Sequence, residues 1–131
     1  MPNKCDKTVN DKRPVNLDFG AIITIPSIAS ILHRITGVFL VAGMAVLIYL
    51  LDESLASEQQ FNDVKMLTSS VMFKLILLAV LAGLIYHSVA GVKHLILDMG
   101  IGETLEGGEL GAKLVIVFSV VLILLAGAWL W

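Results

Sequence analysis

The sequence predicts an all-α membrane protein with three transmembrane helices. Apolar residues make up 57% of the chain and charged residues only 15%, well below the average of about 25% for globular domains. The charges also gather in polar stretches and leave three long apolar blocks. Each block has the length of about 17–25 residues that a helix needs to cross a bilayer, which predicts three spans.

We expect the 131 residues to form one domain with two parts. Residues 1–26 are interpreted as a cytoplasmic N-terminal tail that ends in an interfacial segment, because the polar sequence is followed by an apolar stretch broken at Gly20 and Pro26. Pro26 is suited to the first turn of a helix. Residues 27–131 should form the membrane anchor, with spans at about 27–51, 71–98 and 113–131.

The polar stretches between the spans are predicted to be connections. Residues 52–70 lean acidic and are interpreted as a polar loop. Residues 100–113 are rich in Gly and Glu, which favours a turn-forming connection, and Gly100 is suited to a left-handed cap at the end of the second span. The third span carries almost no polar atoms apart from Ser119, so we expect it to serve mainly in packing.

Basic residues predict the orientation in the membrane. They are concentrated in the N-terminal tail and around the second connection, so the N-terminus is predicted to be cytoplasmic and the C-terminus external. They are too few and scattered to indicate nucleic-acid binding. Cys5 is the single cysteine, so we expect no internal disulfide, no cysteine zinc site and no covalent haem attachment. We recognise no secretory signal peptide.

One face of the second span is the candidate site. At about 100° per residue, small and titratable residues fall within about a quarter of the helix circumference. Small side chains leave room for a flat, bulky group or for a close helix neighbour. We interpret this face as one half of a haem pocket, made by Gly83, His87, Ala90, Gly91, His94 and Asp98.

His87 is the candidate metal ligand because of its depth. It lies seven residues deeper than His94, or about 10 Å at 1.5 Å per residue, whereas His33 and His94 both fall near the cytoplasmic boundary. A desolvated imidazole should be neutral and available to iron, although a histidine on a helix is also found as a hydrogen-bonded structural residue. The same offset predicts that His33 and His87 do not ligate one haem together, and that the second ligand comes from another chain.

The first span places Ser30 and Arg34 one turn apart on the same side. Arg34 lies near the end of the apolar stretch, so its guanidinium can extend to the lipid headgroups. Alternatively, it faces the bundle and binds an anionic or carbonyl-bearing ligand, with the Ser30 hydroxyl beside it. The residues alone leave both interpretations open.

Three stretches resemble the succinate dehydrogenase cytochrome b subunits, the larger membrane anchors of respiratory complex II. Residues 30–37 match the S-x-x-H-R-x-[ST]-G element of that family, and residues 87–100 resemble its H-x-x-x-G-x-R-H-x-x-x-D-x-G element. Residues 13–17 resemble its N-terminal R-P-x-x-L stretch. Lys93 stands where the family usually has arginine, which keeps the charge but not the planar, bidentate fork.

The resemblance implies a cytochrome b anchor that is a non-catalytic subunit of succinate dehydrogenase, in the tricarboxylic acid cycle and electron transport. It implies a bacterial inner membrane with a periplasmic C-terminus, and three partners: a second three-span anchor, an iron–sulfur subunit and a flavoprotein. By position, His87 would be an axial ligand of haem b, and His33 and Arg34 would lie near its propionates. Ser30 and Arg34 would line the site that reduces ubiquinone.

Three alternatives remain open at this point. A fumarate reductase anchor would run the same chemistry with a low-potential quinol. A small transporter or channel subunit would place polar residues in two or more spans, whereas the third span here is nearly bare. A purely structural anchor without haem would lack a b-type absorption spectrum.

Overall fold

A computed structural model describes residues 23–131. Within these residues the chain forms four helices: α2 (Ile25–Ala56), α3 (Glu58–Ser69), α4 (Val71–Asp98) and α5 (Leu105–Leu130). Three of them, α2, α4 and α5, are long and apolar enough to cross a membrane. The predicted all-α class with three membrane helices is therefore confirmed. Residues 1–22, which hold most of the predicted tail and the R-P-x-x-L stretch, lie outside the described residues.

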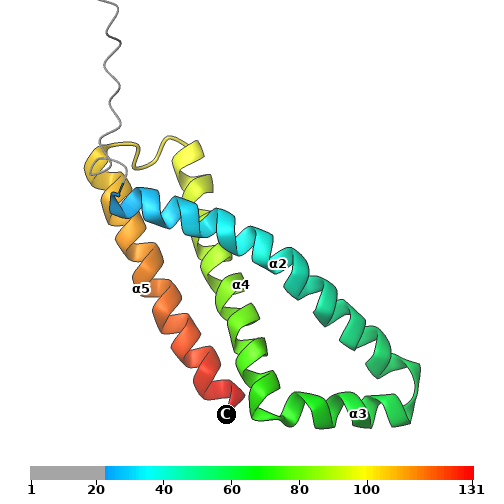
Figure 1. Cartoon of the computed structure of the whole chain (residues 1–131). Helices are drawn as coiled ribbons and strands as arrows, with labels where there is room; N and C mark the ends of the chain where they lie inside the picture. Colours follow the sequence, from blue (N-terminus) through cyan, green and yellow to red (C-terminus); the bar gives the residue numbers. More distant parts are fainter. Residues whose placement is uncertain (1–22) are drawn as a thin grey trace, which may run out of the picture.

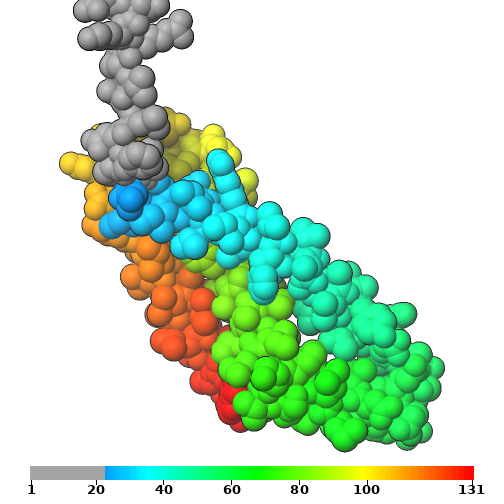
Figure 2. All heavy atoms as spheres, in the orientation of Figure 1, coloured from blue at the N-terminus to red at the C-terminus, as the bar shows by residue number. Residues whose placement is uncertain are grey.

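The central helix is α4, which packs against both α2 and α5. Figure 1 shows α5 running beside α4, while α2 crosses both of them near the end where α4 stops. The short helix α3 joins the far end of α2 to the start of α4. In the space-filling view of Figure 2, the beginning of α2 lies directly against the atoms of α4 and α5. The crossing of α2 and α4 is therefore oblique, with close contact toward one end.

Glycines permit the close approach of α2 and α4. A Cβ atom built on Gly43 would lie 3.1 Å from Val80, and one built on Gly83 would lie 3.1 Å from Phe39. Both distances are tighter than ordinary van der Waals contact. Helices in lipid gain little from burying apolar surface against each other, so this close packing supplies much of the contact energy between them.

The helix α5 also packs through small residues. Its buried positions are Ala112, Val115 and Ser119, which recur about once per turn along one face. Ser119 is only 2% exposed, and its hydroxyl has no hydrogen-bond partner among residues 23–131. Serine is common where membrane helices approach closely, so we interpret Ser119 as a packing residue.

Residues 58–69 form the helix α3, where a polar loop was predicted. The reason is local capping. The Ser57 hydroxyl accepts a hydrogen bond from the Gln60 backbone amide at 3.2 Å and donates one to Oε1 of the Gln60 side chain at 3.2 Å. Gln59 and Asp63 add a hydrogen bond of 3.2 Å one turn apart. The S-x-x-Q sequence at residues 57–60 is a local helix-start signal within an acidic stretch whose composition is typical of a loop.

The helix α5 begins at Leu105, inside the stretch that was predicted as a connection up to residue 113. Thr104 caps its start, since the Thr104 hydroxyl accepts a hydrogen bond from the Gly107 amide at 3.0 Å. A Glu109–Lys113 ion pair of 2.7 Å supports the next turns. Gly100 has a φ angle of 80°, which confirms the left-handed conformation predicted for it at the end of α4.

Candidate functional site

The crossing of α2 and α4 brings the three histidines together. The rings of His33 on α2 and His87 on α4 are stacked, with centroids 4.2 Å apart and planes inclined by 16°. The centroid of the His94 ring, also on α4, lies 5.1 Å from that of the His33 ring. The three imidazoles therefore form a row, in which His33 of α2 lies between His87 and His94 of α4.

This arrangement corrects the expected offset between His33 and His87. The positions of His33 and His87 along their spans predicted a difference in depth of about 10 Å, yet the two rings are in contact. The oblique course of α2 explains the difference, because a tilted helix does not descend at the same rate per residue as its neighbour (Figure 1). The rings nevertheless lie face to face, whereas two ligands of one iron would each point a nitrogen at it from opposite sides.

The hydrogen bonds of His87 define its tautomer. Its Nδ1 lies 3.0 Å from the backbone carbonyl oxygen of His33. A carbonyl oxygen can only accept, so we assign the proton to Nδ1, which donates it to that oxygen. The Thr36 hydroxyl lies 3.4 Å from the same nitrogen and is itself anchored to α2 carbonyls. Consequently Nε2 carries the free lone pair.

The imidazoles of His87 and His33 each lie over a glycine of the opposite helix. A Cβ atom on Gly37 would be 2.9 Å from Cε1 of His87, a distance that real Cβ atoms essentially never show. A Cβ atom on Gly91 would be 3.6 Å from Nε2 of His33. The space beside Gly37 is therefore needed by the His87 ring.

These residues fit a haem iron bound at Nε2 of His87. Histidines that ligate metals usually donate their other ring N–H to a carboxylate, a backbone carbonyl or water, which fixes the ring and raises its basicity. The contact with the His33 carbonyl has this form. Within residues 23–131, no three His, Cys, Asp or Glu side chains are grouped to hold a bare metal ion.

Ser30 and Arg34 lie on α2 beside the histidines. Ser30 is half-buried and Arg34 is exposed, and they are one turn apart on the helix. Across residues 23–131, no carboxylate lies within ion-pair distance of the Arg34 guanidinium, since the single pair is Lys113–Glu109. An unpaired guanidinium on an apolar helix is available to an anionic group or to a polarised carbonyl.

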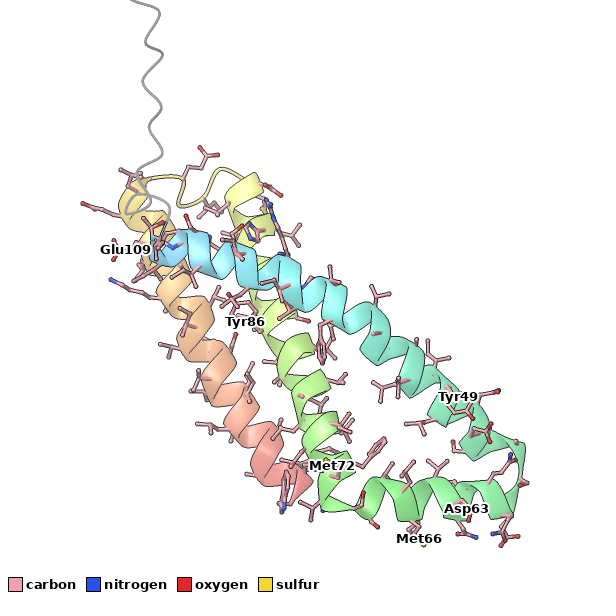
Figure 3. The ribbon with its side chains drawn as sticks, viewed as in Figure 1. Tyr49, Asp63, Met66, Met72, Tyr86 and Glu109 are labelled. Carbon is pink, nitrogen blue, oxygen red and sulfur yellow. The ribbon has the colours of Figure 1, made fainter. Side chains whose placement is uncertain are left out.

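Sequence reasoning missed Tyr86 as a member of this site. Its hydroxyl donates a hydrogen bond of 2.9 Å to the backbone carbonyl of Ala29 on α2. Tyr86 directly precedes His87, and its label marks the crossing in Figure 3. The available signal was chemical, because a phenol inside an apolar span needs a hydrogen-bond partner.

The fold and the site together define a class: a multi-pass, all-α membrane protein with a cluster of imidazoles where two spans cross. Comparison with known families makes the assignment specific. The sequence model of the succinate dehydrogenase/fumarate reductase transmembrane subunit family matches residues 9–126. The chain belongs to this family.

Curated relatives support the same assignment. A succinate dehydrogenase cytochrome b556 subunit of Coxiella burnetii is 38% identical over 125 residues, which cover 94% of this chain and 100% of that protein. The subunit of the same name from Paracoccus denitrificans is 33% identical, with 79% of each chain covered. That of Rickettsia felis is 29% identical, over 93% of this chain and 96% of the relative. The family resemblance seen in the motifs is thus confirmed over most of the chain.

Proposed function

We propose that this chain is the cytochrome b membrane anchor of a succinate dehydrogenase. It binds haem b together with a second three-span anchor subunit and forms part of the site that reduces ubiquinone. Electrons reach that site from an iron–sulfur subunit, which receives them from a flavoprotein. The observation that carries the proposal is the contact between Nδ1 of His87 and the His33 carbonyl, which leaves Nε2 free as a ligand.

The chain's own residues would prepare one side of the haem site. His87 would hold the haem iron through a ring nitrogen, and the partner anchor would provide a further ligand. The His33 carbonyl would hold the His87 ring and Gly37 leaves space for it, while His33 and Arg34 would interact with the haem propionates. When bound, a haem accepts and returns single electrons at a potential that its axial ligands and their hydrogen bonds help to set.

Ser30 and Arg34 would bind ubiquinone and polarise it. The Ser30 hydroxyl donates a hydrogen bond to a quinone carbonyl, and the Arg34 guanidinium stabilises the negative charge that appears on oxygen as electrons arrive. Two electrons and two protons convert the quinone into quinol. The electrons come from succinate oxidation elsewhere in the complex, so this chain contributes binding and electrostatic stabilisation rather than the oxidation step.

We further propose that residues 1–26 form a cytoplasmic tail and interfacial segment, that residues 27–131 form the anchor in a bacterial inner membrane, and that the C-terminus is periplasmic. The distribution of basic residues supports this orientation. The histidine crossing lies at the opposite end of α4 from α3 (Figure 1). With this orientation, the site faces the cytoplasmic side, where a soluble iron–sulfur subunit would bind.

The family description includes fumarate reductase anchors, which would carry out the reverse reaction with a similar site. The names of the three relatives described above all specify succinate dehydrogenase, and this favours succinate oxidation.

Isolation of the complex tests the proposal. The full chain, carrying an affinity tag and extracted from native membranes in mild detergent, should co-purify with a second small anchor, an iron–sulfur protein and a flavoprotein. The preparation should show a b-type spectrum on reduction and reduce ubiquinone with succinate. Purification without a haem spectrum or without those partners would contradict the proposal.

Replacing Gly37 by alanine should weaken haem retention. The added methyl group would lie 2.9 Å from the His87 ring, so the ring must move away from the His33 carbonyl. Loss of such support for a metal-binding histidine typically costs about 10- to 100-fold in affinity. Haem per complex, measured from the reduced-minus-oxidised spectrum during detergent washing or dilution, should fall.

The matched control is Gly108→Ala, because a Cβ atom on Gly108 has no neighbour within 4 Å. This variant should retain haem like the unaltered protein. Equal haem retention in both variants would show that the close contact at Gly37 has no part in the site.

A further inference from the structure

Two consecutive residues of α4 hold two consecutive turns of α2. The Tyr86 hydroxyl donates to the carbonyl of Ala29 at 2.9 Å, and Nδ1 of His87 donates to the carbonyl of His33 at 3.0 Å. Figure 3 labels Tyr86 at the crossing of these helices. Only the second contact is explained by haem ligation, so the first requires its own account.

The anchored carbonyls belong to the peptide groups that carry the proposed quinone residues. A peptide group is planar and rigid, so the Ala29 carbonyl and the Ser30 nitrogen move as one unit. The same holds for the His33 carbonyl and the Arg34 nitrogen. Holding these two carbonyls therefore fixes the backbone positions from which the Ser30 and Arg34 side chains extend.

The first turn of α2 lacks a side-chain cap. Its N-cap residue Thr24 makes no side-chain hydrogen bond to the helix backbone. Its hydroxyl instead lies 3.0 Å from that of Ser27. Helix ends without caps fray over their first residues. Ala29 is 4% exposed, so the Tyr86 hydrogen bond acts at the point where α2 first becomes buried.

We propose that Tyr86 is a positioning residue for the quinone site. It holds the Ala29–Ser30 peptide and thereby the Ser30 hydroxyl, without touching the quinone itself. This inference rests on the proposed function, in which Ser30 and Arg34 line the site.

The test is Tyr86→Phe in the assembled complex, which removes one oxygen atom and keeps the ring. We expect the KM for a short-chain ubiquinone to rise about fivefold, the usual effect of losing one hydrogen bond. Haem content and succinate-driven dye reduction should stay at the level of the unaltered complex. The matched control is Tyr49→Phe, since Tyr49 is 61% exposed and lies near the α3 end of α2, far from Tyr86 (Figure 3).

A double-mutant cycle with Ser30→Ala tests whether Tyr86→Phe changes the KM through Ser30. If Tyr86 acts through Ser30, Tyr86→Phe should change the KM little once Ser30 is alanine. An unchanged KM in Tyr86→Phe alone, or independent and additive effects, would overturn the inference while leaving the quinone site intact. Parallel loss of haem, dye reduction and quinone reduction in Tyr86→Phe would also overturn it, because it would indicate general destabilisation.

The same variants also distinguish a failure of this inference from a failure of the proposed quinone site. If Ser30→Ala and Arg34→Ala both leave the KM unchanged, the quinone site itself is misplaced, and the role of Tyr86 fails with it.

Discussion

Replacing His87 by alanine in the assembled complex should abolish or alter the b-type absorption spectrum, while the chain remains inserted in the membrane. The variant removes the nitrogen that is left free by the hydrogen bond to His33, and the axial ligand helps to set both the retention and the spectrum of a haem. Insertion should persist, because three apolar helices, rather than one imidazole, drive it. Membrane fractionation and a reduced-minus-oxidised spectrum of the purified complex measure the two quantities.

The control for this experiment is His94→Ala, which removes an imidazole from the same helix. His94 lies 5.1 Å from His33 and is not the expected iron ligand, so haem bound in this variant should keep its b-type absorption bands. A second variant, His87→Gly, leaves a space that free imidazole can enter, and added imidazole should restore part of the spectrum. An unchanged spectrum in His87→Ala would remove this residue from the haem site.

Replacing Arg34 by alanine should depress ubiquinone reduction about 100-fold while succinate-driven reduction of an artificial dye persists. The guanidinium is placed to stabilise charge on the quinone oxygen, and removal of one such group commonly costs 10²- to 10³-fold in rate. The dye takes electrons before they reach the membrane site. The ratio of quinone to dye reduction in the purified complex therefore reports on Arg34 alone.

Two further variants test this assignment. Arg34→Lys should recover part of the activity, because lysine keeps the charge but lacks the planar fork. Lys113→Ala removes a cation whose side chain is 55% exposed and paired with Glu109, so both activities should stay near normal. Equal loss of quinone and dye reduction in Arg34→Ala would indicate an assembly defect and would count against a role in quinone binding.

The spans and their class could be predicted from the sequence because the bilayer imposes a length and an apolar composition that are visible residue by residue. The motif around His87 was recognisable for a related reason: a polar side chain inside an apolar helix stands out from its neighbours. Gly100 also has the left-handed conformation that its position predicted. In each case the structural feature depends on residues that are close together in the sequence.

The contacts between helices could not be predicted in the same way. His33 and His87 are 54 positions apart, and the approach of their rings depends on the tilt of α2, which no periodicity encodes. Tyr86 and Ala29 are 57 positions apart and meet for the same reason. The prediction of a loop in place of α3 was wrong for a different reason. The Ser57 cap is a local signal in the sequence, but the acidic composition around it is typical of a loop.

His87 of α4 lies over Gly37 of α2, and His33 of α2 lies over Gly91 of α4. Haem binding therefore requires that the two helices pack in one register. A shift of α2 along α4 by one turn, about 5.4 Å, would separate both ring–glycine pairs and the Nδ1 contact at the same time. With haem bound at His87 as proposed, a chain inserted out of register could not present its ligand. Haem binding would then depend on the correct alignment of α2 and α4.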